Sequence, residues 1–160
     1  LTAVGPELGM HRHREVQTGL PARIAVGCEL AFEFNYPVML KGILPGNGEA
    51  EAEMLVLSIP GCLGMKGIVL GERYKEKDAY DIYSVVGYCH GDPQKVAASV
   101  TPHLGNKHLA AGIDSIRHKF RDIKAEGPSW VAFFSSTDLE VRKREQAAAY
   151  AVIDEFLRAL

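Results

Sequence analysis

The sequence predicts an α+β protein in which a small N-terminal β-hairpin or sheet remnant is followed by a mainly helical C-terminal bundle. Two observations support this order. Apolar and alternating runs flank a Pro/Gly/Asn turn within residues 36–57, and after Ser58 the apolar residues recur at helical spacing. A chain of 160 residues can bury a core without disulfides or metals. We therefore divide it into residues 1–57, a partial β-containing portion, and residues 58–160, a helical domain.

The β portion is expected to consist of one clear hairpin after less regular sequence. Residues 1–22 carry glycines and prolines outside any period, which favours irregular or extended chain. The apolar run 23–34 fits either a strand or a short helix, and its periodicity does not separate the two. Residues 36–44 and 49–57 are expected strands, joined by the turn Pro-Gly-Asn-Gly at 45–48. Alternating glutamates in the second strand share one face and are expected to meet solvent.

The helical domain is predicted from start signals and apolar spacing. Ser58 is an expected N-cap with Pro60 in the first turn, and Asp92 followed by proline opens another helix. Thr137 and Glu140 fit a capping box for the last helix. The expected helices span residues 59–73, 76–89, a short stretch from 92, 104–124, 128–134 and 137–160.

The composition favours a cytoplasmic protein that does not contact membranes. The formal net charge of −2 creates no overall attraction to nucleic acid or lipid. No apolar stretch is long enough for a spanning helix. Three cysteines, an odd number at spacings that match no zinc motif, argue against a disulfide framework. We expect them to be reduced and to pack as small apolar residues.

Charged residues fall on the apolar faces of the first two expected helices. On a helical wheel, Lys66 and Arg73 project into the apolar stripe of the first helix, and Asp78 into that of the second, with Asp81 at its edge. The first stripe consists of Ile59, Cys62, Leu63, Val69 and Leu70, and the second of Ile82, Val85, Val86 and Cys89. Since a lone buried charge is costly, we expect these cations to meet anions, either protein carboxylates or a bound phosphate.

Two interpretations of these charges remain open. In the first, Asp78 and Asp81 stabilise the start of the second helix, and Asp78 pairs with Lys66 and Arg73 in an ion cluster that only organises the two helices. In the second, the same residues bind a ligand. The wheel alone favours neither.

The segment VLSIPGCLGMKGIVLGERYKEKDAYDIYSVV contains the pattern K-x6-R-x3-K-D-x2-D. It resembles the C-terminal motif of the AbiEii/AbiGii toxin type of nucleotidyltransferases, distant relatives of the polymerase-β-like transferases. Lys66, Arg73, Lys77, Asp78 and Asp81 match the motif residue by residue. The preceding GCELAFEF segment, the hairpin and the later GPSWVAFF segment are also similar, so that the resemblance covers about residues 24–135.

The resemblance implies transfer of a nucleoside monophosphate from an NTP to an acceptor such as tRNA. It assigns catalytic roles to Lys66, Asp78 and Asp81, and phosphate contacts to Lys66, Arg73 and Lys77. Asp78 or Asp81 would orient the cations or position the acceptor. The partners implied are the NTP, a tRNA acceptor and an antitoxin protein.

One feature of the family is missing from this sequence. Its members hold Mg²⁺ with an Asp-x-Asp pair upstream of the hairpin, whereas residues 1–57 contain no aspartate. The resemblance therefore implies that this chain is the C-terminal part of such an enzyme, truncated or degenerate, with Mg²⁺ and NTP bound by the full-length protein. We expect no metal site, no bound cofactor and no catalysis in this chain alone.

The alternative function is a non-catalytic helical module that binds RNA or a cognate antitoxin. Two basic runs are the candidate contacts, although such runs are more often solvated helix faces. They comprise Arg117, His118, Lys119, Arg121 and Lys124, and then Arg142, Lys143 and Arg144.

Overall fold

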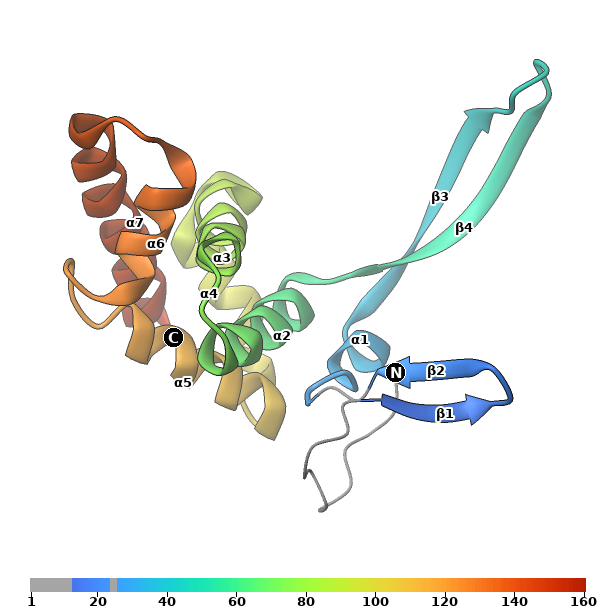
Figure 1. Cartoon of the computed structure of the whole chain (residues 1–160), viewed down its shortest axis with the longest axis horizontal. Coiled ribbons are helices and arrows are strands. Elements are labelled where there is room, and N and C mark those ends of the chain that lie inside the picture. The colour runs from blue at the N-terminus through green and yellow to red at the C-terminus, as the bar shows by residue number, and fades with distance from the viewer. Residues whose placement is uncertain (1–12, 24–25) are drawn as a thin grey trace.

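The computed structural model describes residues 13–23 and 26–160 as an α+β protein (Figure 1), which confirms the predicted fold class. Two antiparallel two-stranded sheets, separated in the chain by α1, precede helices α2 to α7 in the described residues. The elements are β1 (His13–Gln17), β2 (Leu20–Arg23), α1 (Leu30–Glu33), β3 (Asn35–Ile43), β4 (Glu49–Leu57), α2 (Ile59–Glu72), α3 (Glu76–Tyr88), η1 (Cys89–Gly91), α4 (Pro93–Val100), η2 (Thr101–His103), α5 (Lys107–Lys119), α6 (Glu126–Ser135) and α7 (Leu139–Ala159).

The N-terminal region is more regular than the sequence indicates. Strands β1 and β2 are extended, which agrees with one of the two conformations expected for this stretch, but their pairing in a short hairpin was not predicted. Residues 1–12 lie outside the described part. Gly19 supplies the positive φ (76°) that the tight turn requires. The ambiguous apolar run ends as a helix, α1, rather than a strand.

The hairpin of β3 and β4, here called the arm, confirms the predicted strand pair. Its register runs from Asn35 opposite Leu57 to Ile43 opposite Glu49. Figure 1 shows the arm projecting away from the helical body. The alternating glutamates of β4 are exposed as expected, and Glu51 forms an ion pair with Lys41 across the strands.

The helices enclose one hydrophobic core to which α1 also contributes. Helix α2 packs against α5, α3 against α6, and α6 against α7. Fully buried side chains of the core come from every one of these elements: Leu30, Leu63, Leu70, Ile82, Val86, Leu109, Ile116, Val131, Ile153 and Phe156. The body that carries the candidate site is therefore held together by packing between helices distant in sequence.

Helices α2 and α5 touch backbone to backbone through glycines. A Cβ atom added to Gly67 would meet the backbone of Gly112, with its Cα only 2.8 Å away. A Cβ added to Gly112 would likewise meet the Cα of Gly64 at 2.8 Å. Because real Cβ atoms do not approach backbone so closely, these positions admit only glycine at this helix separation. The contact fixes the position of α2, which carries Lys66.

Helix ends follow local side-chain caps and correct some predicted boundaries. The predicted helix 104–124 is shorter in the structure, because Asn106 caps α5 by accepting hydrogen bonds from the backbone N–H groups of His108 and Leu109. The last helix is capped by Asp138 rather than Thr137, since the Asp138 carboxylate accepts from the N–H groups of Glu140 and Val141. The expected cap of α4 is confirmed: the Asp92 carboxylate accepts from the N–H of Gln94.

Within residues 13–23 and 26–160, none of the helices combines the length and the apolar character needed to cross a membrane.

Candidate functional site

The five residues of the K-x6-R-x3-K-D-x2-D pattern meet at the junction of α2 and α3. Lys66 lies in α2, and Arg73 follows its last residue with an extended backbone (φ −141°, ψ 156°), which ends the helix. Lys75 is also extended, so the chain reverses over residues 73–75 before α3 begins. Asp78 therefore lies in the first turn of α3, and Asp81 lies one turn further on.

Asp78 is the buried centre of this arrangement. Its side chain is only 2% exposed, and its Oδ2 accepts a hydrogen bond from Arg73 Nε at 2.8 Å. Its Oδ1 accepts from Arg73 Nη2 at 3.1 Å and from Lys66 Nζ at 3.4 Å. The arginine thus binds the carboxylate with two nitrogens, a geometry that a lysine cannot provide.

Asp81 links two lysines at the outer side of the cluster. Its Oδ2 lies 2.6 Å from Lys66 Nζ, and Lys77 Nζ donates to both of its oxygens at 2.7 and 2.9 Å. Lys66 therefore bridges Asp78 and Asp81. The resulting α2–α3 charge cluster contains Lys66, Arg73, Lys77, Asp78 and Asp81, three cations against two carboxylates, which leaves one formal positive charge in excess.

The predicted clustering of Lys66, Arg73 and Asp78 is confirmed, but the predicted inward placement of the cations is only partly right. The Lys66 side chain is 33% exposed and that of Arg73 is 47% exposed. Helix α2 buries its glycine side together with Leu63, Ile68 and Leu70, whereas Val69 of the expected stripe is only half-buried. The Asp78 carboxylate is therefore the buried charge of the cluster, and Lys66 and Arg73 contact it from the protein surface.

The cluster holds its members in their charged forms. Burial acts to raise the pKa of Asp78, but the hydrogen bonds and charge of Arg73, with Lys66, outweigh it and leave this pKa below its ordinary value. For Asp81, burial is likewise outweighed by Lys66 and Lys77, and the pKa is lowered. Burial would lower the pKa of Lys66, but Asp81 and Asp78 reverse this and raise it.

These directions set the pH range over which the cluster stabilises the fold. Because the folded pKa of each aspartate is lowered, the unfolded chain binds more protons in acid, and the stabilisation is lost as the pH falls below about 4. The raised pKa of Lys66 places the upper limit above about pH 10. Asp81→Asn removes one titrating carboxyl. We therefore expect its melting temperature to fall less than that of the wild type as the pH is lowered below about 4. Thermal denaturation at several pH values measures this, and parallel profiles of the two proteins would contradict it.

The carboxylates of the cluster do not fit a Mg²⁺ site. Each oxygen of Asp78 and Asp81 already accepts from a lysine or arginine, and a divalent cation would have to displace those positive groups. Among the described residues, no group of three or more His, Cys, Asp or Glu side chains is arranged to hold a metal ion. We therefore derive no chemical step through a metal at this cluster.

About half of the basic residues near α5 and α7 are engaged within the protein. Lys119 is nearly buried rather than exposed, which corrects its place among the surface candidates. Its ammonium lies 5.2 Å from the ring centroids of both Tyr74 and Trp130, a cation–π arrangement that the sequence did not reveal. Arg121 pairs with Glu126 at 2.9 Å. Arg117, His118, Lys124, Lys143 and Arg144 are exposed, and Arg142 is half-buried.

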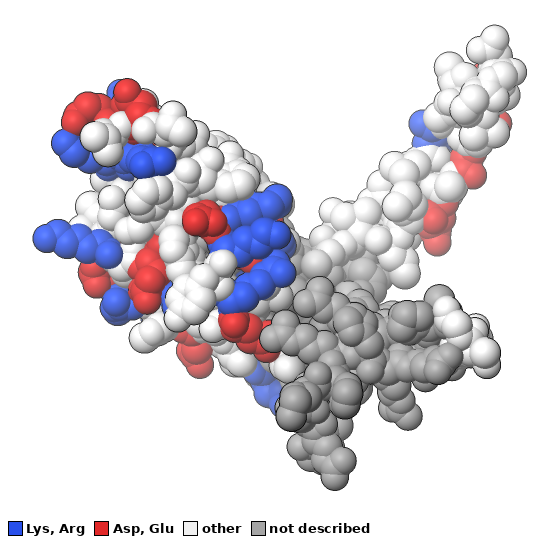
Figure 2. Space-filling view, in the orientation of Figure 1, with Lys and Arg blue, Asp and Glu red and all other residues white. Residues whose placement is uncertain are grey.

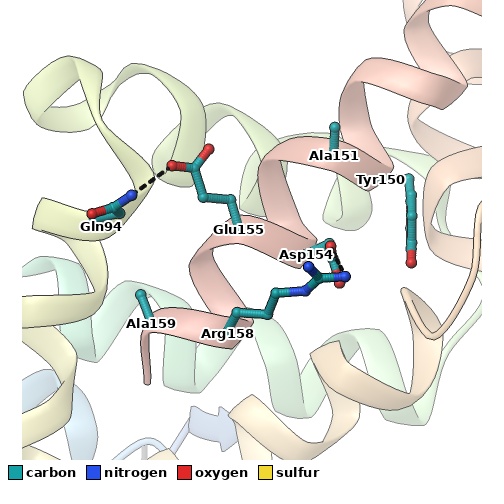
Figure 3. Close-up of a pocket in the computed structure, with 7 residues that line it drawn as sticks. All are labelled: Gln94, Tyr150, Ala151, Asp154, Glu155, Arg158 and Ala159. Carbon is teal, nitrogen blue, oxygen red and sulfur yellow. Dashed lines mark hydrogen bonds and ion pairs between the residues drawn. The ribbon is translucent and has the colours of Figure 1, made fainter.

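A surface depression lies elsewhere, between α4 and the C-terminal half of α7 (Figure 3). Gln94 Nε2 donates to Glu155 Oε1 at 3.0 Å, and Arg158 pairs with Asp154 at 2.9 Å. The depression shares no residue with the α2–α3 charge cluster, and four of its polar side chains are paired with one another.

Comparisons with known proteins give no match: no family model fits the chain, and no curated protein or solved structure is similar to it.

Proposed function

We propose that this chain is the C-terminal part of a nucleotidyltransferase of the AbiEii type, and that the α2–α3 charge cluster receives the phosphates of an NTP. The observation that carries the proposal is the excess of cations over carboxylates at one exposed junction. Three positive side chains converge there, and the two carboxylates that hold them are less exposed than any of the three.

The geometry supports phosphate binding because the cations retain unused donors. A lysine has three N–H donors and an arginine has five. Arg73 uses Nε and Nη2 on Asp78, so Nη1 has no partner among the cluster's carboxylates. In Figure 2, Lys and Arg side chains gather on the side of the helical body nearest the arm. A triphosphate brings several oxygens that match such donors.

In this proposal, Asp78 and Asp81 are positioning residues. Asp78 fixes the guanidinium plane of Arg73. Asp81 holds Lys66 and Lys77 side by side, because both ammonium groups donate to its Oδ2. Preorganised donors cost little reorganisation when charge arrives, which is how fixed cations assist phosphoryl transfer. The carboxylates for Mg²⁺ and the acceptor-binding surface would come from outside the helical domain.

The test measures, by calorimetry and without added metal, the binding of inorganic triphosphate to the 160-residue chain. We expect Lys77→Ala to weaken binding about fivefold, because one charge-assisted contact is lost. Lys77 is suited to this test since Lys66 still pairs with Asp81 when it is removed. The matched control is Lys95→Ala, another exposed lysine near the start of a helix, α4, which should bind as the wild type does.

Absence of binding by the wild type, or equal binding by both lysine variants, would reject a phosphate role for the cluster and leave the ion cluster as a structural device.

The transfer reaction is tested separately. The chain alone is expected to incorporate no labelled NTP into tRNA. Incorporation that EDTA abolishes would show that the chain itself carries the metal ligands.

The alternative, a module that binds RNA or an antitoxin, has less support. The basic runs on which it depends include the nearly buried Lys119 and the paired Arg121, and Lys143 is held by Glu140 at 2.7 Å. Cations engaged in this way contribute less to a field that would attract a polyanion.

A further inference from the structure

One face of the β3–β4 arm carries no charged side chain. The strand register places its residues in four cross-strand pairs, which from the base of the arm to its tip are Tyr36–Val56, Val38–Met54, Leu40–Ala52 and Gly42–Ala50. The charged residues all lie on the opposite face, where Lys41 and the three alternating glutamates of β4 project. The arm therefore has one face without charges, while its other face mixes the charged residues with the exposed apolar side chains of Met39, Ile43 and Leu55.

The uncharged face is exposed along its length. Tyr36, Leu40 and Met54 keep 49%, 47% and 51% of their surface in contact with solvent. The arm stands away from the helical body, and its visible surface is mostly uncharged, with acidic side chains along one side (Figures 1 and 2). A continuous exposed apolar surface of this kind marks a site of association.

We propose that this face docks onto the same face of a second copy of the chain, with the two arms pointing in opposite directions. The face tapers: the pair Tyr36–Val56 at the base is bulky, and the pair Gly42–Ala50 near the tip is small. In a two-fold arrangement each strand lies over its own copy, so the bulky base pair of one arm meets the small tip pair of the other. In the middle of the contact Met54 meets the small Ala52, while Val38 meets Leu40. Sheets that pack face to face need such interdigitation to fill the layer between them.

The charges agree with this occupant. When the uncharged faces meet, the glutamates of both arms point outward to solvent, so no like charges come together in the contact.

The size of the face predicts the strength of the dimer. Strands of nine residues are roughly 30 Å long, so that a two-stranded face covers about 300 Å² on each copy. Stable complexes bury about 1,200 Å² or more in total. We therefore infer a weak dimer that forms and dissociates with protein concentration.

Analytical ultracentrifugation of the full chain, from low micromolar to near-millimolar concentration, tests the proposal with two adjacent substitutions. Leu40→Glu places a carboxylate in the contact and is expected to weaken dimerisation about tenfold or more, because each dimer would bury two unpaired charges. Met39→Glu is the matched control, since Met39 has a similar exposure of 54% but lies on the charged face. It should dimerise as the wild type does.

Three outcomes would overturn the proposal: a wild-type chain that stays monomeric throughout, equal weakening by both substitutions, or association that persists in Leu40→Glu. The last would point to pairing between strand edges or to another surface. Circular dichroism is expected to show the same helix content for all three proteins, because neither residue belongs to the helical core.

Discussion

Replacement of Gly112 by alanine is expected to destabilise the protein by about 3 kcal/mol or more, at the upper end of the range for overpacking. The new Cβ would overlap the backbone of Gly64, and no flexible side chain stands between the two helices to absorb the collision. Helices α2 and α5 would have to separate, which would loosen the contacts that both make in the core. For a chain of this size, the melting temperature should fall by about 6–12 °C.

The control for this prediction is Gly87→Ala in α3. A Cβ there would lie 3.5 Å from Val152 Cγ1, an ordinary contact, and Gly87 has no positive φ. Alanine favours helix over glycine by up to about 1 kcal/mol, so Gly87→Ala should leave stability unchanged or raise it slightly. The two substitutions are chemically identical and differ only in what the methyl group meets. If Gly112→Ala were as stable as Gly87→Ala, α2 and α5 could not be in backbone contact.

The fold class and the arm were predictable because their signals are local. Alternating apolar residues on both sides of a Pro-Gly-Asn-Gly turn specify a hairpin, and the observed strands differ from the expected ones only by a shift of one residue at each end of β3. The hairpin of β1 and β2 was missed, since five- and four-residue strands around a single glycine turn leave little periodicity to detect.

Which residues form the candidate site could be predicted from the sequence, but how deeply each of them is buried could not. The spacing of Lys66, Arg73 and Asp78 brings them together whenever two helices meet at a short turn, and the structure confirms this. Their burial depends on the other helices. A wheel that counts only apolar side chains ignores glycine, and the glycine side of α2 is the one that packs against α5. The cation–π contact of Lys119 joins residues from three separate segments, so no spacing rule reveals it.

Asp78→Ala is expected to destabilise the fold by about 2–3 kcal/mol, the second largest effect among the substitutions considered. Asp78 is 2% exposed and accepts three hydrogen bonds from charged donors, all of which are lost. The loss falls at the lower end for a broken buried ion pair, because the abandoned Arg73 is 47% exposed and can turn to solvent. Urea denaturation measures the free energy of unfolding directly.

Lys66→Ala separates the structural contribution of the cluster from its binding contribution. It leaves Asp78 paired with Arg73 and Asp81 paired with Lys77, so we expect a loss of only about 1 kcal/mol in stability. If the cluster binds triphosphate, the same substitution should weaken that binding about fivefold or more, because Lys66 bridges both carboxylates at its centre. A large loss of stability with unchanged binding would make Lys66 part of a purely structural ion cluster. A variant unchanged in both would mean that Lys66 matters neither to the fold nor to an anion, and that its pairing in the structure carries no measurable energy.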